Sequence, residues 1–339
     1  MRNVCVMTIV IVFSWLITLG IIWTYGDIDR IYYDFYLSTL ANAIFATVTF
    51  HACYLFLSLL RRRHPSPLKE MFFYYKYYIF DSRYLVKVTI MVVTFSVTSA
   101  IYTSFKLQIP SMHPFSWDNT FYLLDKSIHF GISPWEITHR IIPGAIGSWI
   151  INIVYNLWFF IFWCFFCLIV LSKSHSILRY QAFLAFNLCW IVNGCIVALA
   201  FSSVGPCFFE PLVKEANPYA NLMLHLSEQN QWLESKGIPL GLPSLATQDL
   251  LLTNYLDGGK VLGSGISAFP SLHVSIAVLI ALVTQNINSK LSILAWANAG
   301  MILVGSIHLG WHYAVDGYFS IVTTYLIWVL VRQILKFNA

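Results

Sequence analysis

The residues of this chain best suited to chemistry are two histidines and an aspartate in its C-terminal part. His312 and Asp316 stand four positions apart, so on a helix they share one face. The Asp316 carboxylate would then hold the His312 imidazole in one tautomer and raise its basicity, as an activated nucleophile requires. His273 lies near the expected start of another helix, where it could protonate a leaving oxygen. We therefore predict His312 as the nucleophile, Asp316 as the residue that orients it, and His273 as the general acid.

The composition indicates that these residues belong to an integral membrane protein. Of the 339 residues, 58% are hydrophobic and only 10% are charged, whereas a soluble domain carries roughly 25% charged residues. Long apolar stretches cross a hydrocarbon core of about 30 Å as helices, and their lack of alternation excludes a β-barrel. We expect an all-α polytopic protein with about eight transmembrane helices, near residues 4–23, 37–60, 85–105, 148–171, 181–201, 269–285, 291–307 and 312–331.

The distribution of positive charge predicts the orientation of these helices. With the N-terminus inside, the cytoplasmic segments hold 12 of the 20 Lys and Arg residues and the outer connections hold 7, and cytoplasmic loops are enriched in these residues. We therefore expect both termini in the cytoplasm. The site would face the periplasm from a bacterial inner membrane, or the lumen from a eukaryotic secretory-pathway membrane. The net charge of +5 is modest, which disfavours a nucleic-acid partner.

Two of the outer connections are much longer than the spans require. Residues 106–147 and 202–268 contain short amphipathic stretches punctuated by proline and glycine, so we expect ordered pieces that roof a pocket. The spans that begin near residues 269 and 312 also start on this side. Their first backbone N–H groups would point at the site, which is a favourable setting for a phosphate anion.

Two motifs around the histidines resemble signature sequences of a known enzyme family. Pro270-Ser271-Leu272-His273 and His312-x-x-x-Asp316 resemble the second and third motifs of the type 2 phosphatidic acid phosphatase superfamily. They look most like the branch that includes inositol phosphorylceramide synthase and its bacterial membrane relatives. The resemblance implies that His312 attacks phosphorus to form a phosphohistidine, that Asp316 orients His312, and that His273 protonates the leaving group.

The resemblance is strongest in the C-terminal part of the chain. The motif-bearing part covers about residues 202–331, and a weaker similarity to the bacterial relatives runs from Ser104 to Trp135. We expect an N-terminal three-span region, 1–105, followed by a catalytic domain similar to lipid phosphotransferases, 106–339.

The chain departs from the family pattern at the cations that clamp phosphate. The region that corresponds to the first motif, residues 201–209, contains no Lys or Arg, and Ser306 stands where the third motif has an arginine. Lys106, followed by His113-Pro114, fits the first motif with His in place of Arg but lies one helical hairpin too early, so it could be a displaced phosphate ligand. We take Lys106, Ser271 and Ser306 as candidate substrate ligands. A site with few cations suits a phosphodiester, which carries one negative charge, better than a phosphomonoester, which carries nearly two.

These observations predict an enzyme that transfers a phosphorylated head group between lipids at the outer leaflet. Its partners would be a phospholipid or other lipid phosphate, a lipid hydroxyl acceptor or water, and the membrane; no cofactor and no metal are expected. The alternative within the family is a lipid phosphate or polyprenyl diphosphate phosphatase.

Two hypotheses other than phosphoryl transfer stay open. A metal enzyme could use His308, His312 and Asp316 as ligands with His273 completing the set, although Gly310 argues against the continuous helix that this spacing needs. A transporter could relay protons through the histidines, although the spans contain few polar residues at the depth that transport requires.

Overall fold

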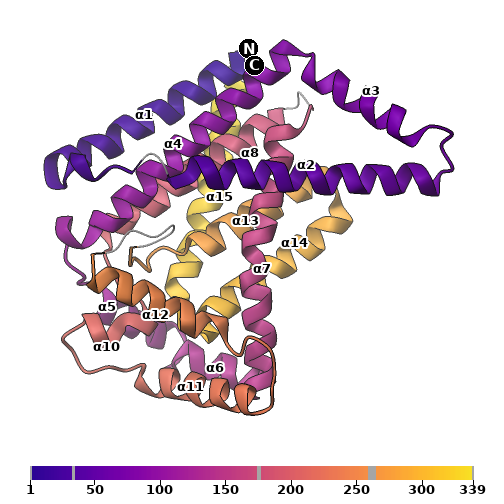
Figure 1. The fold of residues 1–339 in the computed structure, drawn as a ribbon. Helices are drawn as coiled ribbons and strands as arrows, with labels where there is room; N and C mark the ends of the chain where they lie inside the picture. The colour runs from indigo at the N-terminus through magenta and orange to yellow at the C-terminus, as the bar shows by residue number, and fades with distance from the viewer. Residues whose placement is uncertain (1, 33–34, 174–176, 259–264, 338–339) are drawn as a thin grey trace.

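The computed structural model describes residues 2–32, 35–173, 177–258 and 265–337, and this part of the chain contains helices and no β-strand (Figure 1). The helices outside the two long connections are α1 (Arg2–Tyr25), α2 (Phe35–Arg61), α3 (Pro67–Ile79), α4 (Ser82–Met112), α7 (Gly144–Leu171), α8 (Ile177–Leu188), α13 (Leu272–Ile287), α14 (Ser289–His308) and α15 (Ala314–Phe337). α8 continues through a π-helical segment, η2 (Cys189–Val197), into α9 (Ala198–Ala200). The helices of the two long connections are α5 (Asp118–Ile128), α6 (Pro134–Ile141), α10 (Phe209–Leu212), α11 (Ala220–Ser235) and α12 (Pro243–Leu256).

Six helices of the described residues are long and apolar enough to cross a membrane. They are α1, α4, α7, the continuous run Ile177–Ala200, α14 and α15. The expected number of about eight spans is not confirmed. The sixth expected span is α13, whose 16 residues give a length of about 24 Å, less than the roughly 30 Å hydrocarbon core. The second expected span is α2, a helix of 27 residues that lies outside this set of six.

The centre of the bundle is α13. It packs against α14, α15, α8 and α7, and its ten consecutive residues from Val274 to Val283 are all buried. A helix that is apolar on every face is stable only when other helices surround it. Because α13 is enclosed from Val274 to Val283, its first turn, which carries His273, has a fixed position.

The helices of the two long connections lie at one end of the molecule. Figure 1 shows α5, α6, α10, α11 and α12 together, opposite the end where the start of α1 and the end of α15 lie. These helices form the two long connections that the sequence predicts to be ordered, apart from residues 259–264, which lie outside the described residues. The proposed domain boundary at 105/106 falls inside α4, so the two regions share a helix.

The side of the membrane on which this end lies is a prediction from charge, and cysteine labelling tests it. Leu240, between α11 and α12, is 81% exposed, and Leu68 in α3 is 71% exposed. Figure 1 shows α3 away from α11 and α12, on the side of the molecule where the two termini lie. We expect a Leu240→Cys variant to react with a membrane-impermeant maleimide added from the outer side, and a Leu68→Cys variant to react only from the cytoplasmic side. The reverse pattern would contradict the orientation.

Candidate active site

His312 and Asp316 meet as their spacing predicts. The His312 Nδ1 atom lies 3.1 Å from Asp316 Oδ2, and the backbone N–H of Tyr313 donates to the same oxygen at 3.1 Å. Asp316 is fully buried, in the first turn of α15. Because Nδ1 is taken by the carboxylate, Nε2 is the ring nitrogen that can attack an electrophile.

A tight turn between α14 and α15 places His312. The backbone N–H groups of Trp311 and His312 both donate to the Ser306 carbonyl, at 2.9 and 3.1 Å. Gly310 has φ +74°, a conformation that favours glycine, and it reverses the chain after the last turn of α14. The glycine thus breaks the continuous helix that the metal-ligand alternative requires.

His273 reaches the same space from the first turn of α13. The rings of His273 and His312 are 6.3 Å apart between centroids. The His273 ring stacks on Tyr155 at 5.0 Å and lies 4.3 Å from the ring of Trp158, whose Nε1 donates to the His273 carbonyl. Ser271 N–H donates to the Asp316 carbonyl at 3.3 Å, so α13 and α15 are tied together beside the two histidines.

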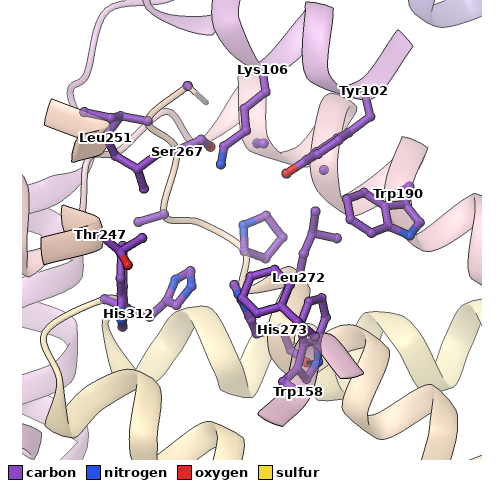
Figure 2. A pocket seen from close by; sticks show the side chains of 18 of the residues that line it. Tyr102, Lys106, Trp158, Trp190, Thr247, Leu251, Ser267, Leu272, His273 and His312 are labelled. Atoms are coloured by element: carbon purple, nitrogen blue, oxygen red, sulfur yellow. Dashed lines mark hydrogen bonds between the residues drawn. The ribbon is translucent and has the colours of Figure 1, made fainter. Parts of the chain in front are cut away.

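The histidines open onto a cavity of about 310 Å³. Figure 2 shows the amine of Lys106 and the rings of His273 and His312 directed toward the same space. Ten aromatic side chains line it: Phe95, Tyr102, Tyr155, Trp158, Phe159, Phe162, Trp163, Trp190, Phe208 and Trp311. The uncharged polar lining residues are Ser99, Asn156, Ser244, Thr247 and Ser267, and among the described lining residues Lys106 is the one Lys or Arg. The cavity thus combines a small reactive end with a large apolar wall.

The electrostatic setting keeps His312 neutral. Burial lowers the pKa of His312, and the positive charge of Lys106 lowers it further, while a hydrogen bond with the Ala268 backbone acts in the opposite direction. Because only the neutral imidazole has a lone pair on Nε2, a lowered pKa keeps the nucleophile in its reactive form at neutral pH.

Of the three candidate substrate ligands, the structure brings only Lys106 to the cavity. Ser271 is the N-cap of α13, and its hydroxyl accepts a hydrogen bond from Val274 N–H. The Ser306 hydroxyl donates to the Leu303 carbonyl. Neither serine lines the cavity, and both are fully buried.

The first turn of α15 is not available to a phosphate. Asp125 of α5 accepts the N–H groups of Ala314 and Val315, at 2.8 and 2.9 Å, and Asp316 accepts that of Tyr313. The expectation that these N–H groups bind the anion is therefore wrong for α15, because carboxylates of the protein already occupy them.

Sequence reasoning missed two buried carboxylates next to the nucleophile. Asp118 and Asp125 are each 2% exposed and stand seven positions apart on one face of α5. Asp118 accepts hydrogen bonds from the backbone of Val204 and Gly205 and, at 2.8 Å, from the Tyr313 hydroxyl. The signal was the i, i+7 spacing of two acidic residues in a connection otherwise rich in aromatic residues.

His308 belongs to a separate cluster. Its Nε2 lies 2.8 Å from the Ser148 hydroxyl and its Nδ1 lies 3.2 Å from that of Thr138, while its ring stacks on His139 at 3.6 Å. Within the described ranges, no group of three or more His, Cys, Asp or Glu residues is placed to hold a metal ion. His308 is therefore a structural hydrogen-bonding residue.

The comparisons with known proteins agree with the site. A family model of the PAP2 superfamily matches residues 119–330, which run from α5 into α15 and include both histidine motifs. No curated protein and no solved structure matches the chain. The match covers more than half of the 339 residues and leaves Lys106 outside it. The chain therefore belongs to the PAP2 superfamily of membrane phosphatases and phosphotransferases that act on lipid phosphates.

Proposed function

We propose that this protein transfers a phosphorylated head group from one lipid to another through a phosphohistidine at His312, at the extracytoplasmic leaflet. The observation that carries the proposal is the shared cavity: two histidine rings 6.3 Å apart, one lysine, and a wall that includes ten aromatic side chains. The family supports phosphoryl chemistry on a lipid, and the cavity supports the finer assignment.

In the first half-reaction, His312 Nε2 attacks the phosphorus of a phosphodiester lipid. A P–N bond forms while the bond from phosphorus to the lipid oxygen breaks. His273, which must carry a proton on both ring nitrogens for this step, donates one of them to that oxygen. The lipid alcohol leaves, and the head group stays on the enzyme as a phosphoramidate. Asp316, hydrogen-bonded to Nδ1, stabilises the positive charge that develops on the ring.

In the second half-reaction, the hydroxyl of an acceptor lipid replaces the departed alcohol. His273, now neutral, takes the hydroxyl proton as the oxygen attacks phosphorus, and the P–N bond breaks to release His312. The product is a new phosphodiester lipid, and both histidines return to their starting protonation states.

The charge of the cavity favours a diester as the donor. Lys106 is the one Lys or Arg among its described lining residues, and the first-turn N–H groups of α15 are taken by Asp125 and Asp316. A phosphomonoester carries nearly two negative charges at neutral pH and a diester carries one. The positive charge of one lysine balances the single negative charge of a diester, but it leaves a monoester with negative charge in excess.

The apolar wall favours a lipid acceptor over water. Phosphohistidine is hydrolysed wherever water reaches it, so transfer requires a site from which water is excluded. Ten aromatic side chains line the cavity, and one of them, Phe159 of α7, is also 50% exposed on the outside of the bundle. A lipid chain could thus reach the cavity from the bilayer without crossing a polar surface.

A substrate panel tests the proposal. Purified protein in mixed micelles is given labelled phospholipids that differ in head group, with and without diacylglycerol or ceramide as hydroxyl acceptor. We expect a new phosphodiester lipid only when an acceptor is present, and little inorganic phosphate from phosphatidic acid. Rapid phosphate release from phosphatidic acid or a polyprenyl diphosphate, with no new phosphodiester, would show instead that the protein is a phosphatase.

A variant that lacks the charge of Lys106 tests the phosphate site in the same assay. Because a hydrogen bond to a charged group is worth about 1.5–3 kcal/mol, Lys106→Met is expected to raise the KM for the diester donor roughly 10- to 100-fold. Lys236→Met, at the exposed C-terminal end of α11, is the matched control and should behave as the parent protein. An unchanged KM in Lys106→Met would remove Lys106 from the phosphate site.

A further inference from the structure

We propose that Asp125 of α5 is a positioning residue for His312, and that its carboxylate fixes the start of α15 in the geometry that catalysis needs. The inference rests on the proposed role of His312 but not on which lipid the enzyme uses. It gives α5 a function that neither the histidine motifs nor the cavity reveals.

Both carboxylate oxygens of Asp125 accept hydrogen bonds from the first turn of α15. Oδ2 accepts the N–H of Ala314 at 2.8 Å, and Oδ1 accepts the N–H of Val315 at 2.9 Å. These two residues lie between His312 and Asp316, the pair whose side chains bond to each other. A shift of Ala314 and Val315 would therefore change the orientation of the His312 ring directly.

The other carboxylate of α5 supports the residues on either side of His312. Asp118 accepts the Tyr313 hydroxyl and the N–H of Gly205. Gly205 has φ +90°, and a Cβ there would lie 2.8 Å from the Trp311 carbonyl, so the loop at Gly205 packs directly against the residue before His312. Asp118 thus fixes the residues on both sides of His312: Tyr313 through its hydroxyl, and Trp311 through the loop at Gly205.

The burial of a carboxylate at this place points to a role beyond capping. A serine or asparagine caps a helix without a buried charge, whereas Asp125 is buried close to a second carboxylate, Asp316. Burial raises the pKa of Asp125 to about 6, and the charge of Asp316 raises it as well, while the Ala314 and Val315 N–H groups and His129 lower it. A buried charge near another of the same sign destabilises a fold.

A pH dependence follows from the sign of this shift. Above pH 6 the carboxylate is ionised and accepts both N–H groups; as the pH falls through about 6, one oxygen gains a proton and one of these bonds is weakened. The other titratable groups near Asp125 are Asp316 and Tyr318 on α15, Tyr219 before α11, and His129 after α5. Because the pKa of His312 is lowered, protonation of His312 itself does not explain a loss of reactivity between pH 7 and pH 5.

The test measures the reactivity of His312 apart from lipid turnover. The purified full-length protein is treated with diethyl pyrocarbonate, which acylates neutral imidazole, and acylation of His312 is followed by mass spectrometry from pH 5 to pH 7.5. We expect the rate in the parent protein to fall about tenfold across pH 6. In Asp125→Asn, which keeps the size of the side chain, we expect a rate that is low at pH 7 and flat with pH. Asp249→Asn, on the exposed face of α12, is the matched control and should follow the parent protein.

Turnover provides the second readout. A small displacement of a reacting group can lower a rate by about 100-fold, so Asp125→Asn is expected to lower kcat 10- to 100-fold with KM changed less than twofold.

Parent-like acylation and kcat in a folded Asp125→Asn would overturn the inference and leave Asp125 a helix cap. If this variant does not fold, the pH profile of the parent protein decides, because a flat profile across pH 6 contradicts the inference. If no lipid is turned over but acylation still depends on Asp125, the proposed function fails and the positioning role stands.

Discussion

Replacing His312 with alanine is expected to abolish turnover while leaving the protein folded. The variant lacks the nitrogen that forms the P–N bond, and loss of the nucleophile in a covalent enzyme lowers kcat by about a millionfold. The His312 side chain faces the cavity with 10% of its surface exposed, so its removal enlarges a space that already exists. Turnover of a labelled phospholipid is the measurement, and thermal unfolding in detergent checks the fold.

Two further variants make this result specific. Asp316→Asn keeps a side chain of the same shape but loses the charge that orients and stabilises the His312 ring, so we expect a small residual activity, as in other triads that lose the carboxylate. His113→Ala is the control, because His113 lies outside the cavity and its Nδ1 contacts the neighbouring Pro114 carbonyl. Turnover in His312→Ala equal to that in His113→Ala would disprove the mechanism.

Replacing His273 with alanine is expected to lower turnover of a natural lipid about 10²- to 10⁴-fold, the contribution typical of a general acid. The loss should depend on the leaving group. A nitrophenolate leaves without a proton, so the first turnover of a 4-nitrophenyl phosphodiester should be slowed less than about tenfold in the same variant. The burst of nitrophenolate on mixing enzyme with substrate measures this first turnover.

The comparison between leaving groups separates a proton donor from a structural residue. His273 stacks on Tyr155 and Trp158, so a merely structural loss would slow both substrates alike. An equal loss with the alkyl and the nitrophenyl ester would show that His273 supports the cavity wall and does not act as the acid.

The sequence predicts the reactive pair well because its geometry is local. His312 and Asp316 are four positions apart, and the structure confirms their contact at 3.1 Å, although His312 lies in the turn before α15 and only Asp316 is on the helix. The all-helical membrane architecture follows from composition, and the histidine motifs lead to the superfamily that the family model confirms. His273 was placed beside His312 because both helices were expected to start on one side, a simple consequence of topology.

The hydrogen bonds from α5 that position the site could not be predicted, because they join residues that are far apart in the sequence. Asp125 and Ala314 are 189 positions apart, and Asp118 and the Tyr313 hydroxyl are 195 apart. No periodicity links residues at such separations, so the first turn of α15 was taken as open to phosphate when a carboxylate already binds it. Ser271, a candidate substrate ligand, is the N-cap of α13 in the structure, a position that suits a serine.

The lengths of the spans also depend on packing. Hydropathy marks where an apolar stretch begins and ends, but α13 is enclosed by other helices over ten consecutive residues, and a helix buried in protein does not need the full thickness of the bilayer. The sequence therefore identified the helix, while the expected number of about eight spans is not confirmed.

The central claim is that a phosphorylated head group is carried on His312, and mass spectrometry tests it most directly. The enzyme is mixed with a diester donor in the absence of acceptor, quenched at alkaline pH, where phosphohistidine is stable, and digested. We expect the peptide that contains His312 to gain the mass of the phosphorylated head group, and to lose it again when a lipid hydroxyl acceptor is added before the quench. Product formation with an unmodified His312 peptide at every time point, or with the added mass on another residue, would contradict the account.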